Sequence, residues 1–227
     1  MHGSAYVICS AKTHRKLVAR LSEATGLPMF VVDYRLAPEH RFPAALDDAY
    51  AAFVWTAEHA AELGVDPARI AVGGHAAGAG LAAAVALRAR DEGGPAIRFQ
   101  LLSQPELDDR LETRSARNFT DTPFMTRPKL VASWGHYLGS TPGSPYAAPA
   151  RAEDLSGLPP AHVATAEFDP LRDEGIAYAV RLLRAGVPVE LHQWAGTFHG
   201  SQAVLSADVS QRQIGELTGV LRRALAD

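Results

Sequence analysis

Residues that could carry out chemistry follow three apolar runs of the chain. The run 69–74 (RIAVGG) leads into a glycine-rich turn around Ala76 and then into an alanine-rich stretch. Asp169 and His199 each follow a later apolar run of the same kind. A carboxylate can fix the tautomer of an imidazole, and that imidazole can then remove a proton from a neighbouring group. The pattern predicts an acid–histidine pair placed beside the turn.

The turn has the layout of a nucleophile elbow, but its apex lacks a nucleophile. In such an elbow a strand, a sharp turn and a helix lift a serine above the sheet. The residue at that position here is Ala76, which has no oxygen to attack an acyl carbon. Loss of the nucleophile from a serine hydrolase costs on the order of 10⁶ in turnover, or roughly 8 kcal/mol of barrier. We therefore expect ester hydrolysis to be absent or very weak.

Other acidic residues lie near Asp169. Glu167 is a weaker rival for the acid role. Asp173 and Glu174 are expected in the first turn of a helix, where carboxylates interact favourably with the helix dipole. Asp169 could also be a turn former before Pro170. The acid role is preferred because the residue follows a strand of the predicted sheet.

Few side chains could replace the missing serine. Ser4 is one candidate, and His75 is another that could assist chemistry. The side chain of His75 should point away from the pocket because it precedes the apex, so it could equally be a hydrogen-bonded support under the turn. Cys9 and Ser10 lie farther along the chain and are discounted.

Short apolar runs alternate with helical patterns along the chain. This alternation predicts a parallel sheet with helices on both faces, and places function at the carboxyl ends of its strands. The segment 104–159 is expected to be an irregular or helical excursion, and residues 1–227 to form a single domain. The predicted strands are 28–34, 69–74, 96–103, 160–167 and 188–194, and the predicted helices are 11–26, 43–63, 76–92, 172–186 and 206–225.

Composition excludes several classes of protein. The net charge of −3 and the pI near 6.3 give no basic surplus for nucleic acid. No apolar run approaches a membrane span. The single cysteine, Cys9, cannot form an internal disulfide or a cysteine-based metal site. We expect a cytoplasmic protein without a metal or other cofactor.

Several long segments resemble the hormone-sensitive-lipase family of esterases and lipases, whose fold is the α/β-hydrolase fold. The resemblance covers essentially the whole chain. The segments that carry it are DYRLAPEHRFPAALDDAYAAFVW (33–55), DPARIAVGG (66–74), LDDRLETRSARNFTDTPFMTR (107–127), SPYAAPARAEDLSGLPPAHV (144–163), EFDPLRDEGIAYAVRLLRAGVPVELH (167–192) and FHG (198–200).

The resemblance implies roles for individual residues. The amides of Gly3, Ser4 and Ala77 correspond to the oxyanion-hole donors, and Asp169 and His199 to an intact acid and histidine. The family elbow reads Gly-Asp-Ser-Ala-Gly-Gly, whereas this chain has His75 and Ala76 in place of the aspartate and serine. Two glycines of the family's His-Gly-Gly-Gly loop are also replaced, by Ser4 and Ala5. Because the departures cluster at the site, we interpret them as natural repurposing rather than an engineered knock-out.

The resemblance also implies a difference in length. Family members carry cap helices and the first strands before the oxyanion loop, and their third strand lies between the equivalents of 28–34 and 69–74. Without that strand two rows of backbone groups would be unpaired, which is costly. Either the polypeptide is longer than this chain, or the strand 28–34 pairs directly with 69–74. Family resemblance further implies a homodimer through the last strand and the C-terminal helix.

Four functional hypotheses follow. The first is non-hydrolytic carbonyl chemistry, such as elimination, isomerisation or cyclisation, with His199 and Asp169 as a general-base pair. The second is a binding protein for a small carbonyl or ester-like ligand. The third is a carboxylesterase whose serine has been removed, and the fourth is a non-catalytic partner subunit. The pocket of a binding protein would be lined by Phe124, Met125, Trp134, Tyr137 and Phe198.

Overall fold

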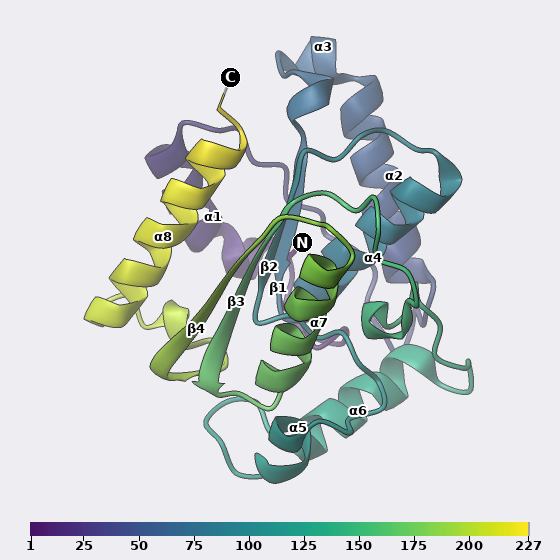
Figure 1. The fold of residues 1–227 in the computed structure, drawn as a ribbon, viewed down its shortest axis with the longest axis vertical. Coiled ribbons are helices and arrows are strands. Elements are labelled where there is room, and N and C mark those ends of the chain that lie inside the picture. The colour runs from purple at the N-terminus through teal and green to yellow at the C-terminus, as the bar shows by residue number, and fades with distance from the viewer. Residues whose placement is uncertain (227) are drawn as a thin grey trace.

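The computed structural model describes residues 1–226 and contains one parallel sheet (Figure 1). Its strand order is β1-β2-β3-β4, and every neighbouring pair is parallel. The connections between these strands pass through helices, as parallel pairing requires. The architecture is the α/β-hydrolase fold class that the alternating pattern and the resemblance predict. The strands are β1 (Ala71–His75), β2 (Phe99–Ser103), β3 (Ala161–Phe168) and β4 (Val189–Phe198).

Helices cover both faces of the sheet. Helices α4 and α7 pack on one face, with α2 outside α4, and α1 and α8 lie together on the other face (Figure 1). The longer helices are α1 (Ala11–Thr25), α2 (Ala44–Glu58), α4 (Ala77–Glu92), α6 (Arg127–Leu138), α7 (Arg172–Arg184) and α8 (Asp208–Ala224). The short ones are α3 (Ala60–Leu63), α5 (Arg114–Asn118), and the 3₁₀ turns η1 (Pro67–Arg69), η2 (Pro149–Arg151) and η3 (Ser201–Ala203).

Helix α4 is the centre of the core. Twelve of its sixteen residues are buried, most of them alanines. A helix buried all round has no amphipathic stripe, and small side chains let it approach β1 and β2 closely. Gly74 and Gly78 show how close the backbones are, because a Cβ on Gly74 would lie 2.3 Å from the Gly78 carbonyl. The alanine-rich sequence therefore sets the position of the elbow directly above β1.

The predicted strand 28–34 is not formed, and this prediction was wrong. The segment runs without strand or helix in the structure, and within residues 1–226 β1 pairs with β2 alone. The segment therefore does not pair directly with 69–74. Its apolar residues instead line a cavity that separates it from β1. Strand propensity alone does not form a strand, because pairing requires a neighbour within hydrogen-bonding distance.

The remaining differences concern element ends. The single helix predicted over 43–63 is divided at His59 into α2 and α3. Strand β2 begins at Phe99, three residues later than the predicted strand 96–103. Strand β4 ends at Phe198, beyond the predicted end at residue 194. In the segment 104–159, helices α5 and α6 lie beyond the carboxyl ends of the strands (Figure 1). This is the end of the sheet at which the candidate site lies.

Candidate active site

Ala76 occupies the turn between β1 and α4. Its backbone has φ 52° and ψ −122°, which a residue with a Cβ rarely adopts. Strained backbone of this kind costs on the order of 1–3 kcal/mol and persists where neighbours impose it. Here the Ala76 N–H donates to the Ser103 carbonyl at 3.0 Å, and its carbonyl accepts from the amides of Ala79 and Glu106. The turn thus keeps the geometry of an elbow although its apex side chain is a methyl group.

His199 and Asp169 form a buried hydrogen-bonded pair. His199 Nδ1 lies 2.8 Å from Asp169 Oδ2, and both side chains are almost fully buried. Because a carboxylate only accepts, Nδ1 carries the proton and Nε2 is left with its lone pair. The other oxygen of Asp169 accepts from the Leu171 amide at 2.9 Å. The acid is therefore fixed from both sides, and the imidazole is held in the tautomer that a general base needs.

The rival acids are engaged elsewhere. Glu167 Oε2 accepts from the Gly196 amide at 2.7 Å. Asp173 and Glu174 lie in the first turn of α7, as predicted. Glu174 is buried and accepts from the amides of Leu107 and Asp108, which ties α7 to the loop after β2. Asp169 is the acid that is bonded to the histidine.

His75 and His199 are linked through Gln104. His75 Nε2 lies 3.0 Å from Gln104 Oε1, and the same oxygen accepts from the Gly200 amide at 2.7 Å. The backbone donor identifies that atom as oxygen, so His75 donates from Nε2 and keeps a lone pair on Nδ1. Burial, with His199 nearby, lowers the pKa of His75 to about 3. His75 is therefore a neutral support for the His199 loop, with its ring centroid 5.1 Å from that of His199.

Gln104 is a further residue of the site that the sequence-based prediction does not include. It follows the end of β2, as Asp169 and His199 follow β3 and β4, so the strand-end rule that found those two could have found it. Its amide ties the loop after β4 to the residue that precedes the elbow. It is the polar group that fixes the distance between these two loops.

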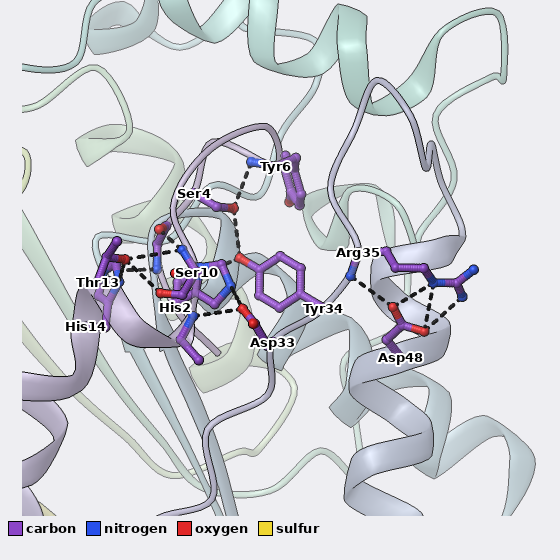
Figure 2. Close-up of polar contacts among 12 residues, drawn as sticks. His2, Ser4, Tyr6, Ser10, Thr13, His14, Asp33, Tyr34, Arg35 and Asp48 are labelled. Atoms are coloured by element: carbon purple, nitrogen blue, oxygen red, sulfur yellow. Dashed lines mark hydrogen bonds and ion pairs between the residues drawn. The ribbon is translucent and has the colours of Figure 1, made fainter.

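The loop that matches the oxyanion motif is anchored by a chain of hydroxyl groups (Figure 2). The Tyr6 amide donates to Ser4 Oγ at 2.9 Å, Ser4 Oγ lies 2.7 Å from the Tyr34 hydroxyl, and Tyr34 donates to the His2 carbonyl at 2.6 Å. Since Tyr34 uses its proton on His2, Ser4 donates to Tyr34. The Ser4 hydroxyl is thus buried and bonded in both roles, which argues against it as a replacement nucleophile.

The two other amides of the expected oxyanion hole differ in their surroundings. Gly3 N–H donates to His14 Nε2 at 3.3 Å, so this donor faces α1. Burial lowers the pKa of His14, which keeps that imidazole neutral and able to accept. The Ala77 amide is the first of α4 and has no acceptor within its own helix. Ala77 therefore offers the better placed donor, and Gly3 would have to leave His14 to contribute.

The aromatic residues expected to line a pocket are mostly core residues, which corrects that expectation. Met125, Trp134 and Tyr137 are buried in the main hydrophobic cluster, and Phe198 is half-buried. Phe124 differs because it is 63% exposed and its ring lies parallel to that of His199, with centroids 6.1 Å apart. Phe124 is the member of the set that could contact a molecule at His199.

A buried carboxyl lies beneath the elbow. Glu106 is fully buried, and its amide donates to the Ala76 carbonyl at 3.1 Å. Burial raises the pKa of its side chain to about 7. Ser133 Oγ lies 2.8 Å from Glu106 Oε1 and 2.9 Å from the Ala5 carbonyl. Because a hydroxyl has a single proton, a protonated Glu106 can donate to Ser133 while Ser133 donates to Ala5.

A parallel α/β sheet with a strand–turn–helix elbow, an acid after the next strand but one and a histidine after the last strand defines the α/β-hydrolase class. The chain belongs to the α/β-hydrolase-fold family, whose model matches residues 1–203. Its motifs place it in the hormone-sensitive-lipase branch of that family, which contains esterases.

Several of the curated proteins that this chain resembles are esterases. The chain is 45% identical to Esterase LipI of Mycobacterium tuberculosis over 204 residues, which is 88% of this chain and 63% of LipI. It is 42% identical to Carboxylesterase NlhH of the same species, over 99% of this chain and 72% of NlhH. The chain thus spans about two thirds of the length of the curated relatives it matches.

Solved structures of esterases superimpose on the whole chain. A bacterial heroin esterase is 51% identical, with a TM-score of 0.98, and the match covers 100% of this chain and 74% of that one. A mutant of the esterase rPPE with a serine replaced by alanine, complexed with (S)-Ac-CPA, is 40% identical with a TM-score of 0.96, covering 100% and 73%. Both are similar along the full sheet and its helices.

The part of the chain that the structure describes contains neither a cluster of metal-binding side chains nor a membrane-spanning helix. Among residues 1–226, no three His, Cys, Asp or Glu side chains gather closely enough to hold a metal ion. None of the helices in that part of the chain combines the length and apolarity needed to cross a bilayer.

Proposed function

We propose that this protein carries out non-hydrolytic chemistry on a carbonyl compound, with His199 as general base and Asp169 as its orienting acid. The supporting observation is the buried pair at 2.8 Å next to an elbow whose apex is Ala76. The pair keeps Nε2 free to accept a proton, whereas no hydroxyl or thiol is present at the apex to form an acyl-enzyme. The esterase relatives make a carbonyl or ester-like molecule the expected ligand.

The proposed reaction starts by removing a proton from the carbon next to the carbonyl. The C–H electron pair moves to form an enolate, and the proton goes to His199 Nε2. The Ala77 amide stabilises the negative charge on the carbonyl oxygen. Return of the proton to carbon gives isomerisation, and loss of a group from the β-carbon gives elimination. Neither outcome needs a nucleophile at Ala76.

Deuterium exchange in D₂O tests this reaction directly. Small ketones and esters are incubated with the protein, and NMR follows the exchange of their α-protons. We expect catalysed exchange by the unchanged protein and a loss of about 10²–10⁴-fold in His199→Ala. Asp169→Asn should lower the rate as well, because the imidazole loses the partner that fixes its tautomer.

Phe168→Ala is a matched control, since Phe168 directly precedes Asp169 in the chain but its side chain is 45% exposed and outside the pair. It should leave the exchange rate unchanged. Equal exchange rates in His199→Ala and in the unchanged protein would refute the proposal, as would an absence of exchange for every carbonyl compound tested.

A second assay asks how much hydrolase machinery remains. Hydrolysis of short-chain p-nitrophenyl esters is compared in the unchanged protein, in Ala76→Ser, and in Ala76→Ser combined with His199→Ala. We expect very weak hydrolysis by the unchanged protein. Ala76→Ser should hydrolyse the esters, and the additional His199→Ala change should abolish that turnover. If Ala76→Ser remains inactive, the oxyanion loop has been remodelled away from ester hydrolysis.

The second candidate is a binding protein that keeps the esterase site without its chemistry. It is favoured by the Gly3 amide, which donates to His14 rather than into the site. The rPPE mutant in which alanine replaces a serine is complexed with (S)-Ac-CPA, so an alanine-substituted esterase of this family can hold a ligand. Thermal shifts with carboxylic esters in both the unchanged protein and His199→Ala, without any α-proton exchange, would support this candidate over the first.

A further inference from the structure

Glu106 contacts both halves of the expected oxyanion hole. Its amide donates to the carbonyl of Ala76, the residue that precedes the Ala77 amide in the elbow. Its side chain reaches the oxyanion loop through Ser133 of α6, whose Oγ lies 2.8 Å from Glu106 Oε1 and 2.9 Å from the Ala5 carbonyl. One residue outside the acid–histidine pair thus connects the elbow, α6 and the oxyanion loop.

The Ala5 carbonyl belongs to a strained part of the oxyanion loop. Ala5 and Tyr6, the two residues that flank this peptide group, both have left-handed backbone, with φ 45° and 59°. Residues with a Cβ rarely adopt this conformation, which persists where neighbours impose it. The Ser133 hydroxyl supplies such a constraint, because it fixes the direction of the carbonyl between the two residues. Loss of this bond would allow the loop to relax at Ala5.

The number of protons decides which hydrogen bonds this cluster can make. Ser133 has one hydroxyl proton, and both Glu106 Oε1 and the Ala5 carbonyl oxygen lie within hydrogen-bonding distance of its oxygen. When the Glu106 carboxyl is protonated, Oε1 donates to Ser133 and Ser133 donates to Ala5. When the carboxyl is ionised, Ser133 donates to the carboxylate, since a hydrogen bond to a charged acceptor is roughly twice as strong as one to a neutral acceptor. The Ala5 carbonyl then loses this donor.

The surroundings of Glu106 favour its protonated form. The side chain is fully buried, and its Oε2 is without a hydrogen-bond partner among residues 1–226. Burial raises the pKa of this carboxyl to about 7, and His199 and Asp169 act on it in opposite directions. The carboxyl therefore changes its charge within the ordinary range of pH.

Other titratable groups interact electrostatically with Glu106 from the elements around it. Burial raises the pKa of three tyrosines among them, so these stay neutral, and it also raises the pKa of a second buried carboxyl. The remaining two groups form the acid–histidine pair. The full set is Tyr6 of the oxyanion loop, Tyr34 of the segment 28–34, Tyr137 of α6, Glu174 of α7, and Asp169 and His199 after β3 and β4.

We propose that Glu106 and Ser133 are positioning residues that hold the oxyanion loop in place while the Glu106 carboxyl carries a proton. In that state, two successive hydrogen bonds run from Glu106 through Ser133 to Ala5 and fix the loop that contains Gly3 and Ser4. Ionisation of the carboxyl redirects the Ser133 hydroxyl and releases the Ala5 carbonyl. The effect on catalysis rests on the proposed function, whereas the change of hydrogen bond does not depend on it.

Carbonyl ¹³C NMR tests the hydrogen bond directly. The Ala5 carbonyl carbon is followed in the full chain between pH 5.5 and 8.5. We expect one upfield step with its midpoint at about 7, because a carbonyl carbon moves upfield when it loses a hydrogen bond. In Glu106→Gln the step should vanish, since glutamine stays neutral at every pH. In Ser133→Ala the resonance should remain at the upfield position throughout.

Thr218→Ala is the control, because the Thr218 hydroxyl also donates to a backbone carbonyl, but within α8. This variant should keep the step of the unchanged protein. A step that persists in Glu106→Gln would assign the titration to another group, such as Glu174, and would overturn the proposal. An Ala5 resonance that does not change with pH in the unchanged protein would overturn it as well.

The pH profile of catalysis gives a second readout. The rate of α-proton exchange in Glu106→Gln is divided by that of the unchanged protein at each pH, so that the ionisation of His199 cancels from the ratio. We expect this ratio to rise about three- to tenfold between pH 5.5 and 8.5, because the variant keeps the bond to Ala5. A constant ratio beside a clear carbonyl step would overturn the positioning role. Absence of exchange in both proteins would refute the proposed function alone, and the Ala5 resonance would still show whether Ser133 changes its partner.

Discussion

At the scale of single residues, the site combines an intact acid–histidine pair with an inert apex. Asp169 and His199 are buried and bonded to each other, and Gln104 holds the His199 loop against His75. The hydroxyl of Ser4, the residue considered as a replacement nucleophile, is already hydrogen-bonded to the Tyr34 hydroxyl and to the Tyr6 amide. We propose that the Asp169–His199 pair transfers protons, since Ala76 has no side-chain oxygen that could form a covalent intermediate.

Glu106→Gln should change how stability depends on pH. Burial raises the pKa of Glu106 to about 7 from an ordinary value of 4.5. Between these two pH values the carboxyl is protonated in the folded protein and ionised in the unfolded chain. Stability from this group is present below pH 4.5 and is lost as the pH rises toward 7, by about 3 kcal/mol in all. Glutamine is neutral throughout, so the variant should be more stable than the unchanged protein at pH 8.

Urea unfolding between pH 4 and 8 measures this effect. Glu153→Gln, at an exposed carboxyl, is the control and should preserve the slope of the unchanged protein. If Glu106→Gln loses stability with rising pH as steeply as the unchanged protein does, Glu106 is not the group responsible. Part of the slope should remain in every variant, because burial also raises the pKa of Glu174.

At the scale of elements, helix α4 and the oxyanion loop are in backbone contact. A Cβ on Gly78 would lie 2.3 Å from the His2 carbonyl and 2.5 Å from that of Met1. Contacts this short are with backbone, which cannot rotate away as a side chain can. The glycine is thus required by the close approach of two chain segments and not by its own dihedral angles.

Gly78→Ala should therefore destabilise the protein. Overpacking of this kind costs about 1–3 kcal/mol, and the loop 1–5 would have to move away from the elbow. The matched control is Gly135→Ala in α6, where a Cβ would meet nothing within 4 Å. That change should stabilise by about 0.5–1 kcal/mol, because alanine favours a helix. Urea denaturation measures the free energy of unfolding of both variants. Equal changes in that free energy would contradict the prediction.

At the scale of the whole molecule, packing is uneven across the sheet. The face covered by α4 and α7 contains most of the hydrophobic core. On the opposite face, α1 has one buried residue, Leu21, and the cavity separates much of this helix from β1. Elements with few buried apolar contacts open at lower free energy than the core does.

Amide hydrogen exchange should report this difference. We expect α1 to exchange by local opening at least tenfold faster than α4, whose amides should require global unfolding. The comparison is made within one sample, so differences in solution conditions cannot produce it. Equal protection of α1 and α4 would mean that the two faces of the sheet unfold as one unit.

The sequence alone determined the parallel α/β architecture, the elbow and the pairing of Asp169 with His199. Those features depend on local period, on glycine and alanine content and on the rule that parallel strands end at one edge, all of which can be read along the chain. The tertiary structure decided the rest. Residues 28–34 have the composition of a strand but lie across a cavity from β1. Gln104, Glu106 and His14 acquire their roles from neighbours distant in sequence, because hydrogen bonding and burial depend on what folding brings into contact.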